Sequence, residues 1–225
     1  MIGPVRSAQP LLDRLVPATV AAVEAYDDEG AAALYPEEAA AVARAVERRR
    51  REFGTVRHCA RRALDRLGRP PAPILPGERG APTWPAGVVG SMTHCAGYRA
   101  AALAHRRDVR AIGIDAEPDD PLPVGVLDAI GRPEERAMVH RLAGSGGPGP
   151  CWDRLLFSAK ESVYKAWFPL ARTFLDFDGA RIAIDPAGTF TAGILAPGPV
   201  TELTGRWQAA RGLVLTAIVV PAGEP

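Results

Sequence analysis

The chain has 225 residues, of which 47% are hydrophobic and 24% are charged, and its formal net charge is +1. A chain of this length and composition can bury a hydrophobic core and belongs to the globular class. Its near-neutral charge argues against a general nucleic-acid-binding protein, which would carry a strong excess of positive charge. We therefore expect no nucleic acid among its partners.

The first residues lack the pattern of an export signal. Residues 11–26 are largely apolar, but Asp13, Arg14 and Glu24 interrupt them. The longest apolar run near the end, residues 212–220, is too short to cross a bilayer. The 3 cysteines are an odd number without zinc-binding spacing. We therefore expect a cytoplasmic protein with reduced thiols, no zinc and no membrane partner.

The first half of the chain predicts two helices, a proline-rich connector and then strands. The first helix begins at Pro36 with two glutamates and ends with arginines, the order that the helix dipole favours. The second stops at Gly68, just before the prolines. The predicted elements are helices at residues 35–53 and 55–68, the connector at 69–85, a strand, turn and strand or short helix at 87–105, and a short strand at 108–118.

The second half predicts helices followed by antiparallel hairpins. The glycines of residues 144–150 form a flexible break and no phosphate loop, because no strand precedes them and no Gly-Lys-Ser/Thr follows. The predicted elements are a proline-rich loop at residues 118–123, helices at 132–143 and 152–168, and hairpins at 180–194 and 205–220. We expect an α+β fold with largely antiparallel sheets, in two halves of similar size that meet near residues 112–120.

Arginines are concentrated in the first two predicted helices. Between Arg44 and Arg69 the sequence has ten arginines and three acids, Glu47, Glu52 and Asp65. Such a run is usually a solvated helix face. The alternative is a wall that binds an anionic ligand, and the sequence leaves both open.

Two carboxylates share one face of the strand predicted at residues 108–118. Ile112 and Ile114 should face a core, because side chains alternate along a strand. Asp115 and Glu117 should then share the opposite face. They are either ordinary acids on an exposed edge or ligands of a hard divalent cation, which takes a couple of carboxylates and keeps positions open for phosphate oxygens.

The last predicted helix contains both lysines of the chain, Lys160 and Lys165, among 27 Lys and Arg residues. Lysine is a compact point charge, unlike the planar guanidinium group, so its presence here indicates contact with a small, dense anion such as phosphate. Glu161 and Lys165 lie opposite the apolar stripe of the helix, with Lys160 on a flank. They form either a surface pair worth about 0.2–0.5 kcal/mol, or a site in which Glu161 joins Asp115 and Glu117 at a cation.

Five stretches together resemble the Sfp/EntD-type 4′-phosphopantetheinyl transferases. GIDAE and FSAKESVYK are similar to the paired signatures of this family, Gly-hydrophobic-Asp-x-Glu and Trp/Phe-Ser/Cys-x-Lys-Glu-Ala/Ser-x-x-Lys. RRREFGTVRHCARRAL, PILPGERGAPTWP and GSMTHCAGY resemble its arginine segment, its Gly-Lys-Pro connector and its Ser-x-Ser-His stretch. The resemblance covers roughly residues 45–170.

This resemblance implies transfer of the phosphopantetheine arm of coenzyme A to a serine of an acyl or peptidyl carrier protein, with release of 3′,5′-ADP. It implies a monomer of two pseudo-symmetric α+β halves, each a largely antiparallel sheet with a helix, and an active site in the cleft between them. Residues 1–116 would contain the arginine segment and bind the nucleotide, and residues 117–225 would contain the catalytic helix and the hairpins. Mg²⁺, or Mn²⁺, would be the cofactor, and the carriers would serve fatty-acid, polyketide or nonribosomal-peptide systems.

The resemblance also implies roles for individual residues. Asp115, Glu117 and Glu161 would hold the metal. Asp115, Glu161 and Lys165 would be catalytic, with Glu161 taking the proton of the carrier serine or positioning the base that does. Lys165 would stabilise the diphosphate and the departing charge, with Lys160 nearby. The residues expected at the nucleotide phosphates are His94 with Ser91 and Thr93 in its turn, Arg49 and Arg57 at the 3′-phosphate, and Arg79 as a further candidate.

Four positions depart from the family pattern. Arg79 replaces the usual lysine of the connector, and Thr93 stands where many members have serine. Phe157 occupies a frequent tryptophan position. Ala116 is smaller than the usual branched residue, which would either open room for a water molecule or change how the coordination of the metal is completed.

Two other functions fit the same residue types. Clustered acids with lysine also serve metal-dependent nucleases and phosphohydrolases, although the Asp…Glu-x-Lys strand pattern of such nucleases is absent from the sequence. A coenzyme A-binding scaffold without activity is the other alternative. The presence of Glu161 and Lys165 together with both strand acids argues against it.

Overall fold

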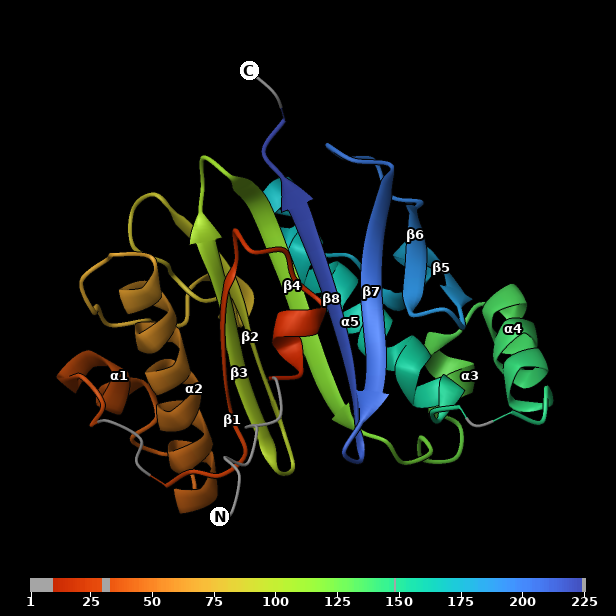
Figure 1. Cartoon of the computed structure of the whole chain (residues 1–225), viewed down its shortest axis with the longest axis horizontal. Helices are drawn as coiled ribbons and strands as arrows, with labels where there is room; N and C mark the ends of the chain where they lie inside the picture. The colour runs from red at the N-terminus through yellow and green to blue at the C-terminus, as the bar shows by residue number, and fades with distance from the viewer. Residues whose placement is uncertain (1–9, 30–32, 148, 224–225) are drawn as a thin grey trace, which may run out of the picture.

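The computed structural model describes residues 10–29, 33–147 and 149–223. Two antiparallel sheets lie side by side, with strand orders β1-β3-β2 and β4-β8-β7-β6-β5 (Figure 1). The strands are β1 (Ala21–Ala25), β2 (Val88–Cys95), β3 (Tyr98–His105), β4 (Val109–Pro118), β5 (Ala180–Asp185), β6 (Thr189–Ile194), β7 (Glu202–Ala210) and β8 (Leu213–Pro221). The helices are α1 (Pro36–Ala41), α2 (Glu47–Arg66), α3 (Val126–Ile130), α4 (Pro133–Ala143) and α5 (Trp152–Ala171), with 3-10 helices η1 (Leu12–Arg14), η2 (Glu78–Gly80) and η3 (Phe177–Gly179). No helix within the described ranges combines the length and apolarity needed to cross a membrane.

Each sheet carries one long amphipathic helix. α2 packs on the three-stranded sheet through residues such as Ala63 and Leu64, and α5 packs on the five-stranded sheet through residues such as Leu155 and Val163. A third core contains apolar side chains of both sheets and of residues 11–20, and η1 lies across β4 in Figure 1. The predicted α+β fold with two antiparallel halves is therefore confirmed.

α5 approaches β4 so closely that only glycine fits between them. A Cβ atom added at Gly113 would lie 1.9 Å from the carbonyl oxygen of Ser162. The helix is also fixed to β8, because the hydroxyls of Ser158 and Thr216 lie 3.0 Å apart in the interior. Close packing at Gly113 therefore sets the depth at which the polar face of α5 meets β4.

The arginine-rich helix begins later than predicted. In place of one helix over residues 35–53, α1 ends before a turn and α2 begins at Glu47. Val46 has an extended backbone (φ −64°, ψ 155°), which separates the two helices. α2 then continues through Gly54, which is buried against Leu34, so packing offsets the weak helix preference of glycine. The two helices predicted from the sequence merge at this point.

β1 was missed by the sequence analysis, because its short sequence has no distinctive alternation. Tertiary contacts of Glu24 fix this strand. The Glu24 carboxylate accepts the N–H groups of Leu11 (2.8 Å) and Leu12 (2.9 Å) and the hydroxyl of Tyr98 (2.8 Å). The predicted segment at 87–105 proved to be two strands, and the later helices and hairpins correspond to α4, α5, β5–β6 and β7–β8.

β4 pairs with β8 along its length, so the expected division between residues 116 and 117 falls inside one strand. Ala116 is fully buried in the core that includes Ile112 and Ile114. Its side chain thus lies on the opposite face of β4 from Asp115. The expectation that Ala116 leaves room for water beside the carboxylates is wrong for this reason.

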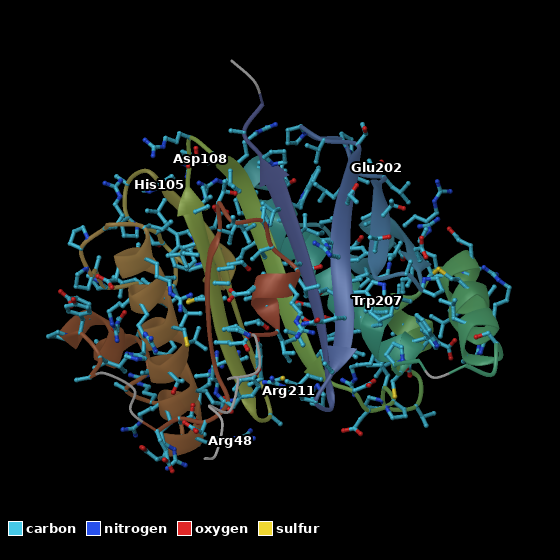
Figure 2. The ribbon with its side chains drawn as sticks, in the orientation of Figure 1. Arg48, His105, Asp108, Glu202, Trp207 and Arg211 are labelled. Carbon is cyan, nitrogen blue, oxygen red and sulfur yellow. The ribbon has the colours of Figure 1, made fainter. Side chains whose placement is uncertain are left out.

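An aromatic contact joins the hairpins to the start of α5. Trp207 on β7, labelled in Figure 2, meets Trp152 edge to face with ring centroids 5.5 Å apart. The indole N–H of Trp207 also donates to the carbonyl oxygen of Asp185 at 2.9 Å. β7, α5 and the end of β5 are therefore held together at one point.

Gly113→Ala should destabilise the protein, because the new methyl group would overlap the Ser162 carbonyl oxygen and force α5 away from β4. We expect the free energy of unfolding to fall by about 1–3 kcal/mol, as for other overpacked cores, measured by urea denaturation. Gly147→Ala is the matched control, because a Cβ there meets nothing within 4 Å. Equal stability of the two variants would contradict the packing argument.

Candidate active site

A cavity of about 940 Å³ opens between the two halves. Its walls are α2, the connector around η2, strands β2 and β4, and α5. This volume is near the upper end for small-molecule sites, which span roughly 300–1,000 Å³. The predicted site residues that line it are Arg49, Arg57, Arg79, Ser91, Thr93, His94, Asp115, Glu161 and Lys165. Glu117 and Lys160 are not among its lining residues.

Asp115 is a buried carboxylate on β4, with 4% of its surface exposed. Its Oδ1 accepts hydrogen bonds from the Thr93 hydroxyl at 3.2 Å and from the Lys165 ammonium group at 2.7 Å. Its Oδ2 is buried without a hydrogen-bond partner in the described part of the chain. A buried carboxylate oxygen without a partner is costly, so this atom marks a position that a cation would stabilise.

Glu161 and Lys165 lie one turn apart on α5, and both line the cavity. The Lys165 ammonium group donates to the Ile114 carbonyl oxygen (3.2 Å) as well as to Asp115. Burial raises the pKa of Glu161; the Lys165 ammonium group opposes this shift, and the negative charge of Asp115 adds to it. Glu161 is therefore a better proton acceptor than an exposed glutamate.

Glu117 is turned toward a different partner. Its Oε2 accepts a hydrogen bond from Arg154 Nη1 at 3.1 Å, from the first turn of α5. Burial and the charge of Asp115 raise the pKa of Glu117, and Arg154 lowers it. Across residues 10–29, 33–147 and 149–223, no three His, Cys, Asp or Glu side chains are placed to hold a metal ion. The predicted convergence of three carboxylates is not present in this arrangement.

Asp115 and Glu161 by themselves suit a hard divalent cation. Both line one cavity, and Asp115 Oδ2 lacks a hydrogen-bond partner within the described structure. Mg²⁺ is commonly held by one or two carboxylates and completes its shell with water and phosphate oxygens. Glu117 binds Arg154 through Oε2 and does not line the cavity, so it is not placed beside these two carboxylates.

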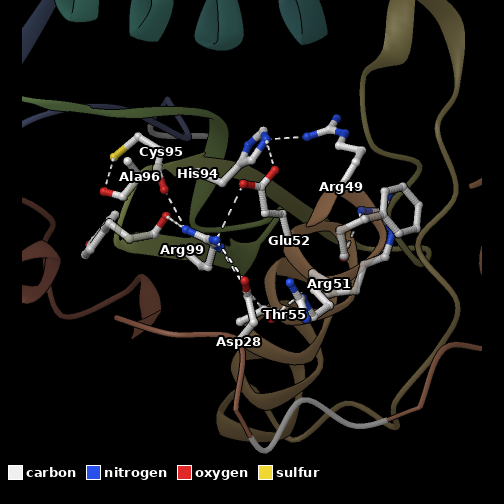
Figure 3. A network of polar contacts seen from close by, with 12 residues as sticks. Asp28, Arg49, Arg51, Glu52, Thr55, His94, Cys95, Ala96 and Arg99 are labelled. Atoms are coloured by element: carbon white, nitrogen blue, oxygen red, sulfur yellow. Dashed lines mark hydrogen bonds and ion pairs between the residues drawn. The ribbon is translucent and has the colours of Figure 1, made fainter. Parts of the chain in front are cut away.

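His94 belongs to a network of charged residues beside α2 (Figure 3). Arg49 Nη1 donates to His94 Nε2, and Glu52 Oε2 lies 3.8 Å from the same nitrogen. Arg99 links this group to Asp28, which follows β1. Its Nη2 lies 3.6 Å from Glu52 Oε1 and 2.9 Å from Asp28 Oδ2. Burial lowers the pKa of His94, and the charge of Arg49 lowers it further. Both effects disfavour the imidazolium form, and Nε2 is the acceptor in this contact because a guanidinium group can only donate.

Arg57 is a buried arginine in the α2 wall. Its guanidinium carbon lies 3.0 Å from the centroid of the Phe53 ring, and its Nε donates to the Ile74 carbonyl oxygen at 2.9 Å. Burial lowers the pKa of Arg57 to about 10, and Glu38, 4.0 Å away, opposes the shift. Arg57 thus stays charged at neutral pH and is fixed by contacts on several sides.

Arg79 lies in the connector wall and is exposed. Its backbone is left-handed (φ 52°). Its guanidinium carbon lies 5.4 Å from the centroid of Phe174, which follows α5. The connector of the first half therefore contacts the second half through this side chain.

The hydroxyls of Ser91 and Thr93 point toward β4. Ser91 Oγ accepts the N–H of Ile114 at 3.1 Å, and Thr93 Oγ1 accepts the N–H of Ala116 at 3.2 Å. Both residues line the cavity. Thr93 also donates its proton to Asp115, so a phosphate contact by this hydroxyl would compete with that bond.

Lys160 is not brought to the cavity. Its side chain is 2% exposed, and its ammonium group contacts Glu135 (2.9 Å), the Phe177 carbonyl oxygen (2.6 Å) and the Ala180 carbonyl oxygen (3.1 Å). Glu135 on α4 also accepts the N–H of Ile182 at 2.7 Å. The three ammonium donors are all engaged, so Lys160 joins α5 to α4 and β5.

Three residues that shape the site were missed by the sequence analysis: Glu52, Arg99 and Arg154. Glu52 could have been found, because it lies one helical turn after Arg49, where side chains are neighbours. Arg99 and Arg154 act on residues distant in sequence. No local pattern predicts such contacts.

This fold and site define a two-half α+β enzyme with acid and lysine side chains in the cavity between the halves. The family described as "4'-phosphopantetheinyl transferase N-terminal domain" matches residues 37–104, and the "4'-phosphopantetheinyl transferase superfamily" matches residues 111–218. The two matches together include both long helices and strands of both sheets, but not β1. The chain belongs to the 4′-phosphopantetheinyl transferase family, as its resemblance predicted.

Three relatives extend over most of the chain. 4'-phosphopantetheinyl transferase Svp of Streptomyces mobaraensis is 59% identical, covering 87% of this chain and 83% of that protein. PptT of Mycobacterium tuberculosis is 52% identical, covering 93% and 98%. Npt of Nocardia iowensis is 45% identical, covering 92% and 99%. The similarity therefore applies to both halves.

Lys160→Met should destabilise the fold, because it leaves the buried Glu135 carboxylate without its charged partner. We expect a loss of about 3–5 kcal/mol in the free energy of unfolding, measured by urea denaturation. The double variant Lys160→Met/Glu135→Met removes both charges and should recover part of this loss. Wild-type stability combined with weaker binding of coenzyme A would instead place Lys160 at the ligand.

Proposed function

We propose that this chain moves the 4′-phosphopantetheine arm of coenzyme A onto a serine of an acyl or peptidyl carrier protein and releases 3′,5′-ADP. The observation that supports this most directly is the single cavity shared by Asp115, Glu161 and Lys165 and by arginines of α2. Coenzyme A carries a diphosphate and a 3′-phosphate, so it suits a cavity with several cationic side chains and a potential metal site.

In this reaction the serine oxygen forms a bond to the phosphorus that carries the pantetheine arm. The bond from that phosphorus to the bridging oxygen of the diphosphate breaks, and 3′,5′-ADP leaves with the electron pair. Positioning and charge neutralisation dominate phosphoryl transfer. Glu161, whose pKa is raised by burial, takes the proton of the serine hydroxyl or orients the group that takes it.

Asp115 and Glu161 would hold Mg²⁺, or Mn²⁺, and Glu117 would join them if its side chain turned into the cavity, which it does not line here. The bound ion supplies neutralisation of the diphosphate charge. Lys165 is fixed 2.7 Å from Asp115, which keeps a positive charge beside these carboxylates. That charge can offset the negative charge that builds on the departing 3′,5′-ADP.

The α2 wall would receive the nucleotide phosphates. Arg57 offers a fixed guanidinium group, because Phe53 and Ile74 already hold it. Arg49 is exposed and can exchange His94 for a phosphate oxygen. Arginine grips phosphate with two parallel hydrogen bonds, so both side chains suit the 3′-phosphate, with Arg79 as a further contact from the connector.

The oligomeric state, the location, the choice of metal and the identity of the carriers stay predictions. They are a monomer in the cytoplasm, Mg²⁺ or Mn²⁺ as the metal, and carriers from fatty-acid, polyketide or nonribosomal-peptide systems. A panel of apo carriers assayed side by side would identify the carriers served.

Incubation with coenzyme A, Mg²⁺ and an apo carrier protein should add one phosphopantetheine arm to the carrier, detected by mass spectrometry. Glu161→Gln should lower kcat by about 10²- to 10⁴-fold and leave the affinity for coenzyme A largely intact. Glu202→Gln is the control, because Glu202 is exposed on β7 (Figure 2) and does not line the cavity. No mass increase on any of several carriers would contradict the function, and nucleotide release without a carrier would indicate a phosphohydrolase.

Coenzyme A binding should take up a proton near and below pH 6.5, the ordinary pKa of histidine. In the free protein the pKa of His94 lies below its ordinary value, and a bound phosphate would raise it by favouring the protonated form. Calorimetry in buffers of different ionisation enthalpy measures this uptake. The charged groups that face His94 are Arg49 and Glu52 on α2, Arg99 on β3 and Lys165 on α5.

His94→Gln should abolish the proton uptake, and His105→Gln should not, because His105 does not line the cavity. The same uptake in both variants would show that His94 does not meet the phosphate.

A further inference from the structure

The two sheets meet at strands β2 and β4 without forming a shared ladder. In the described part of the chain β2 pairs with β3, and β4 pairs with β8. Each is thus the inner edge of its own sheet, and Figure 1 shows them next to each other. The backbone N–H groups of β4 that face β2 therefore need another acceptor.

Two hydroxyls of β2 provide these acceptors. Ser91 Oγ lies 3.1 Å from Ile114 N, and Thr93 Oγ1 lies 3.2 Å from Ala116 N. The two bonds are spaced by two residues on both strands, so they replace successive rungs of a ladder. Ser91 is 3% and Thr93 is 5% exposed. Each buried hydroxyl thus has a hydrogen-bond partner on β4, as buried polar groups generally do.

Thr93 makes one bond more than Ser91. Its hydroxyl accepts from Ala116 N and donates to Asp115 Oδ1 at 3.2 Å. A backbone carbonyl at this position could accept but could not donate to a carboxylate. The hydroxyl is therefore suited to joining the strands and holding Asp115 with one oxygen atom. The branched side chain of threonine also restricts its rotamers, which keeps this oxygen in place.

We propose that Ser91 and Thr93 are positioning residues that join the nucleotide-binding half to the catalytic half, and that Thr93 fixes the Asp115 carboxylate for the reaction. The inference rests on the proposed function. It assigns both hydroxyl oxygens to amides of β4, and it removes Thr93, whose proton goes to Asp115, from the set of direct phosphate ligands. His94 follows Thr93 directly in β2. The same strand therefore carries the imidazole proposed to meet a phosphate of coenzyme A and the hydroxyl that orients Asp115.

Amide hydrogen exchange tests the two hydrogen bonds between β2 and β4, and this measurement does not require an active enzyme. Thr93→Val keeps the side-chain shape and removes the hydroxyl, so the Ala116 amide should exchange about 2- to 10-fold faster, the equivalent of one lost hydrogen bond. Ser91→Ala should have the same effect at the Ile114 amide. Thr93→Ser retains the hydroxyl and should keep the Ala116 amide protected. Unchanged exchange in both Thr93→Val and Ser91→Ala would overturn the proposal.

Kinetics test the role of Thr93 toward Asp115. Thr93→Val should lower kcat roughly 10- to 100-fold, as other changes behind a ligating carboxylate do, with the KM for coenzyme A within about threefold of wild type. Thr93→Ser should restore kcat. Thr191→Val on β6 is the matched control, because Thr191 is exposed and does not line the cavity. Raised KM with unchanged kcat in Thr93→Val would overturn the proposal and make the hydroxyl a phosphate ligand.

The outcomes separate this inference from the proposed function. If the wild-type protein transfers no arm to any carrier, the function fails, and the exchange experiment still decides whether the hydroxyls join the strands. If transfer occurs and Thr93→Val matches wild type in kcat and in Ala116 exchange, the function stands and the inference fails. Should Thr93→Val not fold, Thr93→Ala and Thr93→Ser provide the same comparison.

Discussion

The site depends on one buried carboxylate at the boundary between the two sheets. Taking the Asp115 charge out of water is costly, and the cost is offset only by partners that reach it in the interior. Lys165 arrives from α5 and Thr93 from β2, and both bind the same oxygen. The other oxygen has no hydrogen-bond partner in the described residues. A single acid thus fixes how a helix of the second half and a strand of the first half meet.

Close packing makes these contacts possible. Because Gly113 has no side chain, α5 lies directly on β4, and Lys165 can donate to both Asp115 and the Ile114 carbonyl oxygen. A larger residue at Gly113 would move the whole helix and its polar face. The backbone glycine, which takes no part in the chemistry, is therefore as important to the site as the charged residues.

The two lysines of the chain form ion pairs with two different carboxylates. Lys165 meets Asp115 at the cavity, and Lys160 meets Glu135 in the core. Each ammonium group also contacts carbonyl oxygens within 2.6–3.2 Å, in spaces that suit a compact point charge. The arginines beside the cavity are held instead by acids and rings: Arg57 of α2 lies on the Phe53 ring, and Arg99 of β3 pairs with Glu52. Lysine is thus retained where the acceptors lie close around one nitrogen.

Local patterns in the sequence determined much of this protein. Alternation placed Asp115 and Glu117 on one face of β4, helical spacing placed Glu161 and Lys165 together, and the signature residues predicted the family. The tertiary structure alone decided the partner of each side chain. It turned Glu117 toward Arg154, took Lys160 into the core with Glu135, and directed the hydroxyl of Thr93 to Asp115. Periodicity describes one element at a time, whereas these contacts join elements distant in the chain and depend on how closely they pack.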